Sequence, residues 1–259
     1  MKVTIIQTNL FWEDREKNLA HFDTLINKIN EPTDLIVLPE MFTTGFSMNP
    51  EKIAEQHLTI THNWLLKKAE EKNAIITGSV AIKDGNNYFN RLHWIEPNGN
   101  SSFYDKRHLF RMAKEDEKYT AGKEKIIKQI GNFNIMPLVC YDLRFPVWSR
   151  NFKNHQPLYD VLVYFANWPE VRNYPWKQLL IARAIENQCY VIGVNRIGKD
   201  GNDFNHSGDS MIINPRGEII NKPKANEENI ETIILDKTYL EEFRKLFPIG
   251  LDADEFELK

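Results

Sequence analysis

Short, unbroken apolar runs are the feature of this chain that most restricts its fold. Residues 34–40, 134–140 and 160–166 are rich in Val, Ile and Leu, and each run is too short for a typical helix. Runs of this kind are typical of strands that are covered on both faces by other layers. We therefore expect buried strands at the centre of a layered domain.

Amphipathic helices and hairpins separate the buried strands. Apolar side chains recur at helical spacing from about residue 14 to residue 30, and the turn at residues 84–87 predicts a hairpin. Because strand–helix alternation is mixed with hairpins, we expect the α/β class, in a layered α+β arrangement with the helices outside. We predict one domain over residues 1–259. The same patterns predict helices over 61–72, 174–188 and around 240–247, and strands over 3–8, 74–82, 102–106, 126–130, 190–195 and 230–235.

Composition excludes several classes of protein. The hydrophobic content of 42%, the net charge of -3 and the absence of a basic run are ordinary for a globular protein that binds no nucleic acid. No apolar stretch approaches the roughly 20 residues that span a bilayer, so we expect no membrane partner. Two cysteines are no disulfide framework, which favours a cytoplasmic location. The histidine contexts and the absence of a glycine-rich phosphate loop predict no metal and no cofactor.

Three predicted strands end at residues with reactive or charged side chains, namely Glu40, Lys106 and Cys140. Ligands bind beyond the carboxyl ends of strands in α/β sheets. A thiol there can attack a carbonyl carbon if a carboxylate accepts its proton, and an ammonium can stabilise the resulting oxyanion. Taken singly, each residue has a simpler interpretation, as a core cysteine or a solvated charge. After Cys140 we expect a polar turn and a helix near residues 146–151, and we expect residues 107–125 to form a long loop.

The segments that carry these residues resemble the three catalytic motifs of the nitrilase superfamily, the carbon–nitrogen hydrolases. They are residues 38–42 (LPEMF), 104–110 (YDKRHLF) and 139–146 (VCYDLRFP), in the order of that family. Further agreement at residues 167–169, 182–188 and 208–218 extends the resemblance over nearly the whole chain. Residues 41–48 and 252–256 are similar to the bacterial ω-amidase branch, which hydrolyses 2-oxoglutaramate and 2-oxosuccinamate. The resemblance implies a four-layer α-β-β-α sandwich and a homodimer.

The resemblance also implies catalytic roles for individual residues. Glu40 would be the general base, and Cys140 would attack the amide carbon to form a thioester. Lys106 and the backbone N–H of Tyr141 would hold the oxyanion. Protonated Glu40 would release ammonia, and water would then hydrolyse the thioester.

The family has a second glutamate in the loop after the lysine. Glu115 lies at the family's distance before residues 121–122, and Glu117 is the alternative match.

Arg144 is our candidate for binding a substrate carboxylate. Arginine pairs with a carboxylate through two parallel hydrogen bonds, which lysine cannot do. The alternative is a structural ion pair with Asp142 or Asp160. Phe46 and Trp168 are candidates for the pocket wall, since ligand sites are mostly apolar, although either also fits a core position.

Other residues have structural interpretations, and other functions stay open. We expect Cys189 to serve packing, Arg183 and Glu186 to form an ion pair on a helix, and His206 to have an exposed structural role. A nitrilase, a carbamoylase or another amidase of the same superfamily is one alternative function. A second is a Cys-His hydrolase or acyltransferase with His108 or His206 as base, and a third is a non-catalytic binding protein on the same fold.

Overall fold

The computed structural model describes residues 1–258, and Lys259, with which the predicted single domain ends, lies outside the described residues. The first sheet comprises β1 (Lys2–Gln7), β2 (Leu35–Val37), β3 (Glu55–Gln56), β4 (Ile75–Asp84), β5 (Asn87–Ile95), β6 (Ser101–Asp105) and β16 (Asn229–Ile234). Its strand order is β16-β1-β2-β4-β5-β6, with β3 paired to β4. Strands β4 and β5 pair antiparallel, which confirms the predicted hairpin.

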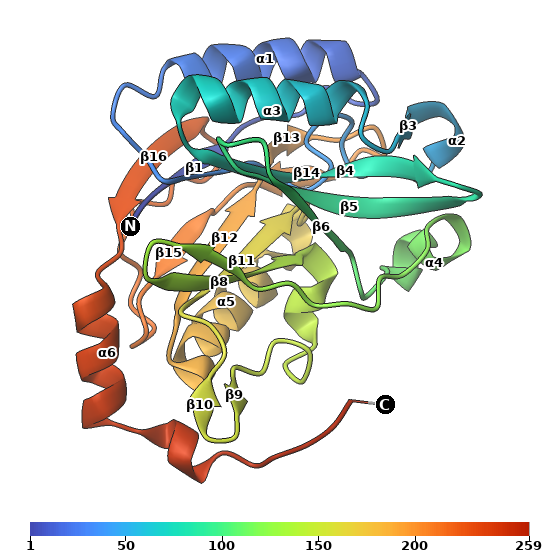
Figure 1. Cartoon of the computed structure of the whole chain (residues 1–259). Helices are drawn as coiled ribbons and strands as arrows, with labels where there is room; N and C mark the ends of the chain where they lie inside the picture. The colour runs from blue at the N-terminus through green and yellow to red at the C-terminus, as the bar shows by residue number, and fades with distance from the viewer. Residues whose placement is uncertain (259) are drawn as a thin grey trace.

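The second sheet lies face to face with the first (Figure 1). It comprises β7 (Lys128–Ile130), β8 (Phe133–Val139), β11 (Val161–Ala166), β12 (Tyr190–Asn195) and β15 (Met211–Ile213), in the order β15-β12-β11-β8-β7. Strands β8, β11 and β12 are parallel, so their carboxyl ends meet at one edge of the sheet. Two small ribbons complete the strands: β9 (Phe152–Lys153) with β10 (Gln156–Pro157), and β13 (Ile197–Lys199) with β14 (Asn205–Ser207).

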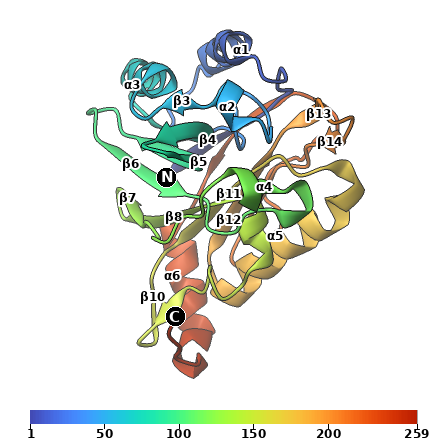
Figure 2. The ribbon, with the colours of Figure 1, turned by 90° about the vertical axis from the view of Figure 1, so that its right-hand side faces the viewer.

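Helices cover the outer faces of both sheets. Helices α1 (Arg15–Asn27) and α3 (Ile60–Lys72) lie on the first sheet, and α5 (Asn173–Asn187) lies on the second (Figure 2). The layers therefore follow the order α-β-β-α, which confirms the predicted fold class. Helix α6 (Lys237–Leu246) follows β16 and packs beside the second sheet through Leu240, while α2 (Pro50–Ile53) and α4 (Glu115–Lys118) are short helices within loops.

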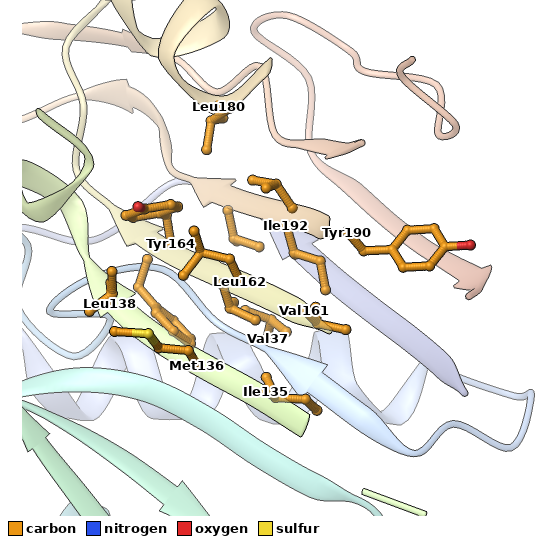
Figure 3. Close-up of a cluster of buried hydrophobic side chains, with 14 of the residues drawn as sticks. Val37, Ile135, Met136, Leu138, Val161, Leu162, Tyr164, Leu180, Tyr190 and Ile192 are labelled. Atoms are coloured by element: carbon orange, nitrogen blue, oxygen red, sulfur yellow. The ribbon is translucent and has the colours of Figure 1, made fainter. Parts of the chain in front are cut away.

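Alternation along the central strands explains why both faces of the first sheet are buried. Leu35 and Val37 of β2 belong to the core cluster between the sheets, whereas Ile36 and Leu38 belong to the cluster under α1 and α3. Successive side chains of a strand point to opposite faces, so an unbroken apolar run requires a layer on each side. Figure 3 shows Val37 beside side chains of the second sheet, with Leu180 of α5 on that sheet's far face.

The predicted helix at residues 146–151 is wrong. A 3₁₀ helix, Cys140–Arg144, follows β8 directly, and turns follow it. Pro146 ends the 3₁₀ helix, because proline disfavours the helical conformation at the preceding residue, and Phe145 has φ -116° and ψ 86°. The six residues 146–151 are too few for helical propensity alone to sustain a helix. The predicted loop at 107–125 also differs, since it contains the 3₁₀ helix Arg111–Ala113 as well as α4.

Candidate active site

The carboxyl ends of strands from both sheets bring Glu40, Lys106 and Cys140 together. The exposed fractions are 0% for Glu40, 1% for Lys106 and 9% for Cys140, so all three residues are buried. Lys106 and Cys140 line a cavity of about 560 Å³, whose wall also contains Phe46 and Trp168. A cavity of this size accommodates a small organic substrate.

Glu40 follows β2 and is held by donors from distant parts of the chain. Its Oε1 accepts hydrogen bonds from Asn90 Nδ2 at 2.8 Å and from Lys106 Nζ at 3.0 Å. Its Oε2 accepts the backbone N–H of Asn167 at 2.8 Å, and the Asn167 side chain donates to the Glu40 carbonyl oxygen. Asn90 and Asn167 therefore fix the direction of this carboxylate, and neither was identified as a site residue from the sequence.

Lys106 lies between two carboxylates. Its Nζ donates to Glu40 and also to both oxygens of Glu115, at 3.1 and 2.9 Å. Burial acts to lower the pKa of Lys106, but the negative charges of Glu115 and Glu40 outweigh burial and raise it. The ammonium therefore keeps its proton.

Glu115 begins α4 and is the glutamate that the fold brings to the lysine. Its side chain is fully buried, and its Oε2 also accepts the backbone N–H of Phe110 at 2.6 Å. Burial raises the pKa of Glu115, against the opposing effect of Lys106. Glu117 instead lies at the surface, 4.0 Å from Lys114. Of the two candidates, the structure thus places Glu115 within the site, and its catalytic role stays a prediction.

Cys140 occupies a strained turn between β8 and the following 3₁₀ helix. Its φ of 44° lies in the left-handed region, which is uncommon for residues other than glycine and clusters at functional sites. Burial raises the pKa of the Cys140 thiol, the Glu40 carboxylate raises it further, and Lys106 opposes both. The resting thiol is therefore protonated at neutral pH, and a nucleophilic attack requires a base.

Asp142 holds the turn of Cys140 against the segment that carries Lys106. Its buried carboxylate accepts the Val139 backbone N–H at 3.0 Å, the Tyr104 hydroxyl at 2.7 Å, and the backbone N–H and ring Nδ1 of His108 at 2.9 and 2.7 Å. Sequence reasoning considered Asp142 only as a partner for Arg144. Its position two residues after Cys140 is the only feature of the sequence that points to Asp142, and this position does not predict its hydrogen-bond partners.

The guanidinium of Arg144 lines the cavity and stacks over the ring of Trp168, with 5.0 Å between its carbon and the ring centroid. The alternative ion pairs do not form. Asp142 is engaged as described, and Asp160 pairs with Lys237 and Arg244 at 2.6 and 2.7 Å. Among the described residues 1–258 the Arg144 guanidinium has no ion-pair partner, so it is available to bind an anion.

Phe46, Trp168 and Tyr141 all line the cavity, and their roles toward a substrate stay predictions. The Phe46 ring also lies 4.8 Å from Lys106 Nζ. Trp168 is nearly fully buried, with an exposed fraction of 4%, so it serves the core and the wall at once.

The predicted exposed role of His206 is wrong, because His206 is 2% exposed and lines the cavity. His206 itself belongs to β14, which pairs antiparallel with β13 and sets His206 opposite Gly198. Arg183 and Glu186 do form the predicted ion pair, at 2.8 Å, and Cys189 is fully buried in the core. His108 is directed to Asp142 and stacks on Phe145, with ring centroids 3.8 Å apart.

Among residues 1–258, no group of three or more His, Cys, Asp or Glu side chains has an arrangement that could bind a metal ion. Over the same residues, no helix combines the length and the apolar character that crossing a bilayer requires.

The four-layer α-β-β-α fold is that of a nitrilase-type hydrolase, and in this chain a thiol, an ammonium and a carboxylate lie beyond the carboxyl ends of its strands. The family model described as carbon-nitrogen hydrolase matches residues 2–245, and the chain belongs to this family.

Relatives are similar over their whole length. The chain is 47% identical to Omega-amidase YafV of Escherichia coli (strain K12), over 100% of this chain and 98% of that protein. It is 33% identical to 2-oxoglutaramate amidase of Bacillus subtilis (strain 168), over 96% of each. The crystal structure of XC1258 from Xanthomonas campestris, a CN-hydrolase superfamily protein with an arsenic adduct in the active site, has a TM-score of 0.96 at 40% identity, and the match covers 100% of this chain and 99% of that one.

Proposed function

We propose that the protein is an ω-amidase that hydrolyses the terminal amide of 2-oxo-dicarboxylic acid monoamides, such as 2-oxoglutaramate and 2-oxosuccinamate. The products are the 2-oxo acid and ammonia. One observation carries the proposal: the buried residues Glu40, Lys106 and Cys140 lie together beside a cavity. The wall of this cavity also contains Arg144, which forms no ion pair within residues 1–258. The 47% identity to an omega-amidase over the full length supports the same substrate class.

In the first step, Cys140 attacks the amide carbon and Glu40 takes the thiol proton. The raised pKa of the thiol makes this transfer necessary, because little thiolate exists before attack. A new C–S bond forms while the carbonyl π electrons move to oxygen. Lys106 Nζ, held by its two carboxylates, and the Tyr141 backbone N–H stabilise the oxyanion.

In the second step, protonated Glu40 gives its proton to the amide nitrogen, the C–N bond breaks, and ammonia leaves a thioester. Water then attacks the thioester carbon while Glu40 accepts a proton from the water. The C–S bond breaks, and the sulfur recovers its proton as the 2-oxo acid forms. Glu115 acts by holding Lys106 in position throughout.

At the other end of the substrate, Arg144 binds the carboxylate and Phe46 and Trp168 enclose the carbon chain. We expect Arg144→Ala to raise KM for 2-oxo-acid amides with little change in kcat, because the contact is made equally in the ground and transition states. An unchanged KM would reject this assignment.

The decisive experiment is to measure ammonia release from 2-oxoglutaramate, 2-oxosuccinamate, glutamine and a simple nitrile. Wild type and Cys140→Ala are compared, with Cys189→Ala as the control because that cysteine lies in the core. Turnover of the 2-oxo amides that is lost in Cys140→Ala and retained in Cys189→Ala supports the proposal. Ammonia from none of the substrates removes the ω-amidase assignment.

One glutamate variant and one histidine variant distinguish the proposed mechanism from a Cys-His mechanism. We expect Glu40→Gln to abolish turnover, because the amide cannot accept the thiol proton. His206 lines the cavity and is the histidine to test against it. Activity that survives Glu40→Gln and is lost in His206→Ala would contradict the glutamate mechanism.

We further propose that the protein works as a homodimer in the cytoplasm and that residues 1–259 form a single domain. Both cysteines are free, which suits a reducing compartment. Exposed apolar side chains near the ends of α5 and α6, Ile185, Leu246 and Phe247, are candidates for the dimer contact. Sedimentation of the purified protein tests the dimer.

A further inference from the structure

A second arginine, Arg172, lines the same cavity as Arg144. It ends the 3₁₀ helix Glu170–Arg172, immediately before α5, and its side chain is half-buried. Within residues 1–258, the guanidiniums of Arg144 and Arg172 form no ion pair and no hydrogen bond. A partly buried cation without a counter-ion is costly, which makes two of them in one cavity a feature to explain.

Each guanidinium rests on its own aromatic ring. Arg144 lies over Trp168, and Arg172 lies over Phe110, with 5.3 Å between its guanidinium carbon and the ring centroid. Phe110 in turn contacts the ring of Tyr141, at a centroid distance of 5.0 Å. Stacking on aromatic faces orients a planar guanidinium while leaving its N–H groups available.

Trp168 connects the two arginines. Its ring supports the Arg144 guanidinium, and its Nε1 donates a hydrogen bond of 2.7 Å to the Arg172 carbonyl oxygen. Trp168 is itself fixed, because its backbone N–H donates to Asn195 Oδ1 at 2.8 Å and its ring packs 5.5 Å from Trp176. The buried Trp168 side chain therefore fixes the positions of Arg144 and Arg172 relative to each other.

The other charges that line the cavity already have partners. Lys106 is paired with two glutamates, and Glu13 is paired with Lys52 at 2.6 Å. Asp200 accepts the backbone N–H groups of residues 202 and 204 at 2.8 and 3.0 Å. Burial lowers the pKa of Arg172, the neighbouring Cys140 side chain opposes this effect, and the charge of Arg144 lowers the pKa further.

We propose that Arg172 acts together with Arg144 as a two-arginine clamp for the 2-oxo-acid end of the substrate. The carboxylate and the adjacent keto group present three acceptor oxygens, which two guanidinium forks can bind at once. Arg172 is then a specificity-determining residue, and Trp168 is the positioning residue that sets the clamp. The substrate named here rests on the proposed amidase function, whereas binding of a 2-oxo dicarboxylate does not.

The first test compares Arg172→Gln with wild type on two amides that differ only at the clamped end. These are 2-oxoglutaramate and 4-oxopentanamide, in which a methyl group replaces the carboxylate. Loss of a charge-assisted contact predicts a KM for 2-oxoglutaramate that is about 10- to 100-fold higher, with a nearly unchanged kcat. KM for 4-oxopentanamide should rise by a much smaller factor, because this amide retains only the keto oxygen of the clamped end.

Arg216→Gln is the matched control, since Arg216 also stacks on an aromatic ring, Phe243 at 4.9 Å, but is exposed and does not line the cavity. Trp168→Phe tests positioning, because phenylalanine keeps a ring under Arg144 and removes the donor to Arg172. We expect it to raise KM for 2-oxoglutaramate by a clearly larger factor than KM for 4-oxopentanamide, because both amides lose the same wall contact and only the first loses the clamped carboxylate. An equal loss on both amides would overturn the positioning role.

The second test measures binding without turnover. In the Cys140→Ala background, calorimetry of 2-oxoglutarate should show an affinity about 10- to 100-fold weaker when Arg172→Gln is added. Unchanged affinity overturns the clamp, as does ammonia release from 2-oxoglutaramate with an unchanged KM in Arg172→Gln. Arg172-dependent binding in an enzyme that hydrolyses no 2-oxo amide supports the clamp and rejects the proposed function alone.

Discussion

Replacing Asp142 by asparagine tests whether a single buried carboxylate unites the nucleophile turn with the lysine segment. The substitution preserves shape and exchanges one acceptor oxygen for an NH₂ group. In the wild type each carboxylate oxygen accepts two hydrogen bonds, one from a backbone N–H and one from a side chain. The backbone donors belong to His108 and Val139, and the side-chain donors are the His108 ring and the Tyr104 hydroxyl.

The expected loss of stability follows from these contacts. Whichever way the amide of Asp142→Asn turns, its NH₂ faces one backbone N–H, either of His108 or of Val139, that cannot become an acceptor. A buried donor without a partner costs about 1–3 kcal/mol, and the remaining bonds lose their charge-assisted character. We therefore expect the free energy of unfolding to fall by about 2–4 kcal/mol.

Activity should fall as well, because Val139 precedes Cys140 and His108 follows Lys106 by two positions. A displacement of about 1 Å in such a group can reduce the rate about 100-fold. The assay combines urea denaturation with kcat/KM for 2-oxoglutaramate.

The matched control is Asp236→Asn, at the exposed N-cap of α6. Asp236 accepts the backbone N–H groups of Thr238 and Tyr239 at 2.9 and 3.2 Å. Asparagine and aspartate are nearly equal as N-caps, so this variant should stay within about 0.5 kcal/mol of wild type. An Asp142→Asn protein as stable and as active as this control would refute the reasoning.

Three further predictions concern other parts of the fold. Gly122→Ala should lower kcat at least about 10-fold and lower the free energy of unfolding by about 1–3 kcal/mol, because the new Cβ would lie 2.0 Å from the Asp105 carbonyl oxygen. Steady-state kinetics and urea midpoints measure the two effects. A fully active variant contradicts the prediction. Burial lowers the pKa of His93 from 6.5 to about 3, so the unfolded chain binds more protons than the folded one between these values. The free energy of unfolding should fall as the pH falls through this window, by up to about 1.4 kcal/mol per pH unit. In urea titrations at several pH values, His93→Leu should reduce this pH dependence by the contribution of about one proton. An identical pH dependence in the variant would show that His93 does not cause it. Iodoacetamide should label native protein at Cys140, which lines the cavity, and should label Cys189 only after unfolding, as peptide mass analysis would show; labelling of native Cys189 would count against its place in the core.

The sequence by itself determined the layers and the ends of the strands. Unbroken apolar runs require cover on both faces, and the end of each run marks where a side chain leaves the sheet. The positions of Glu40, Lys106 and Cys140 could therefore be predicted, because the carboxyl ends of strands meet at one edge. The helix expected at residues 146–151 does not form, because a segment of six residues cannot sustain a helix by its own propensity.

Only the tertiary structure decided which groups meet inside the site. Asn167 is 127 residues from Glu40 along the chain, and no local pattern predicts that its N–H fixes that carboxylate. Likewise, Arg172 reads as an ordinary helix-flanking residue until the fold places it over Phe110. His206 has the sequence context of a loop residue, whereas the fold places it in β14 with an exposed fraction of 2%. Periodicity reports which face of an element is buried, whereas partners and pKa values depend on distances between segments that are set by packing.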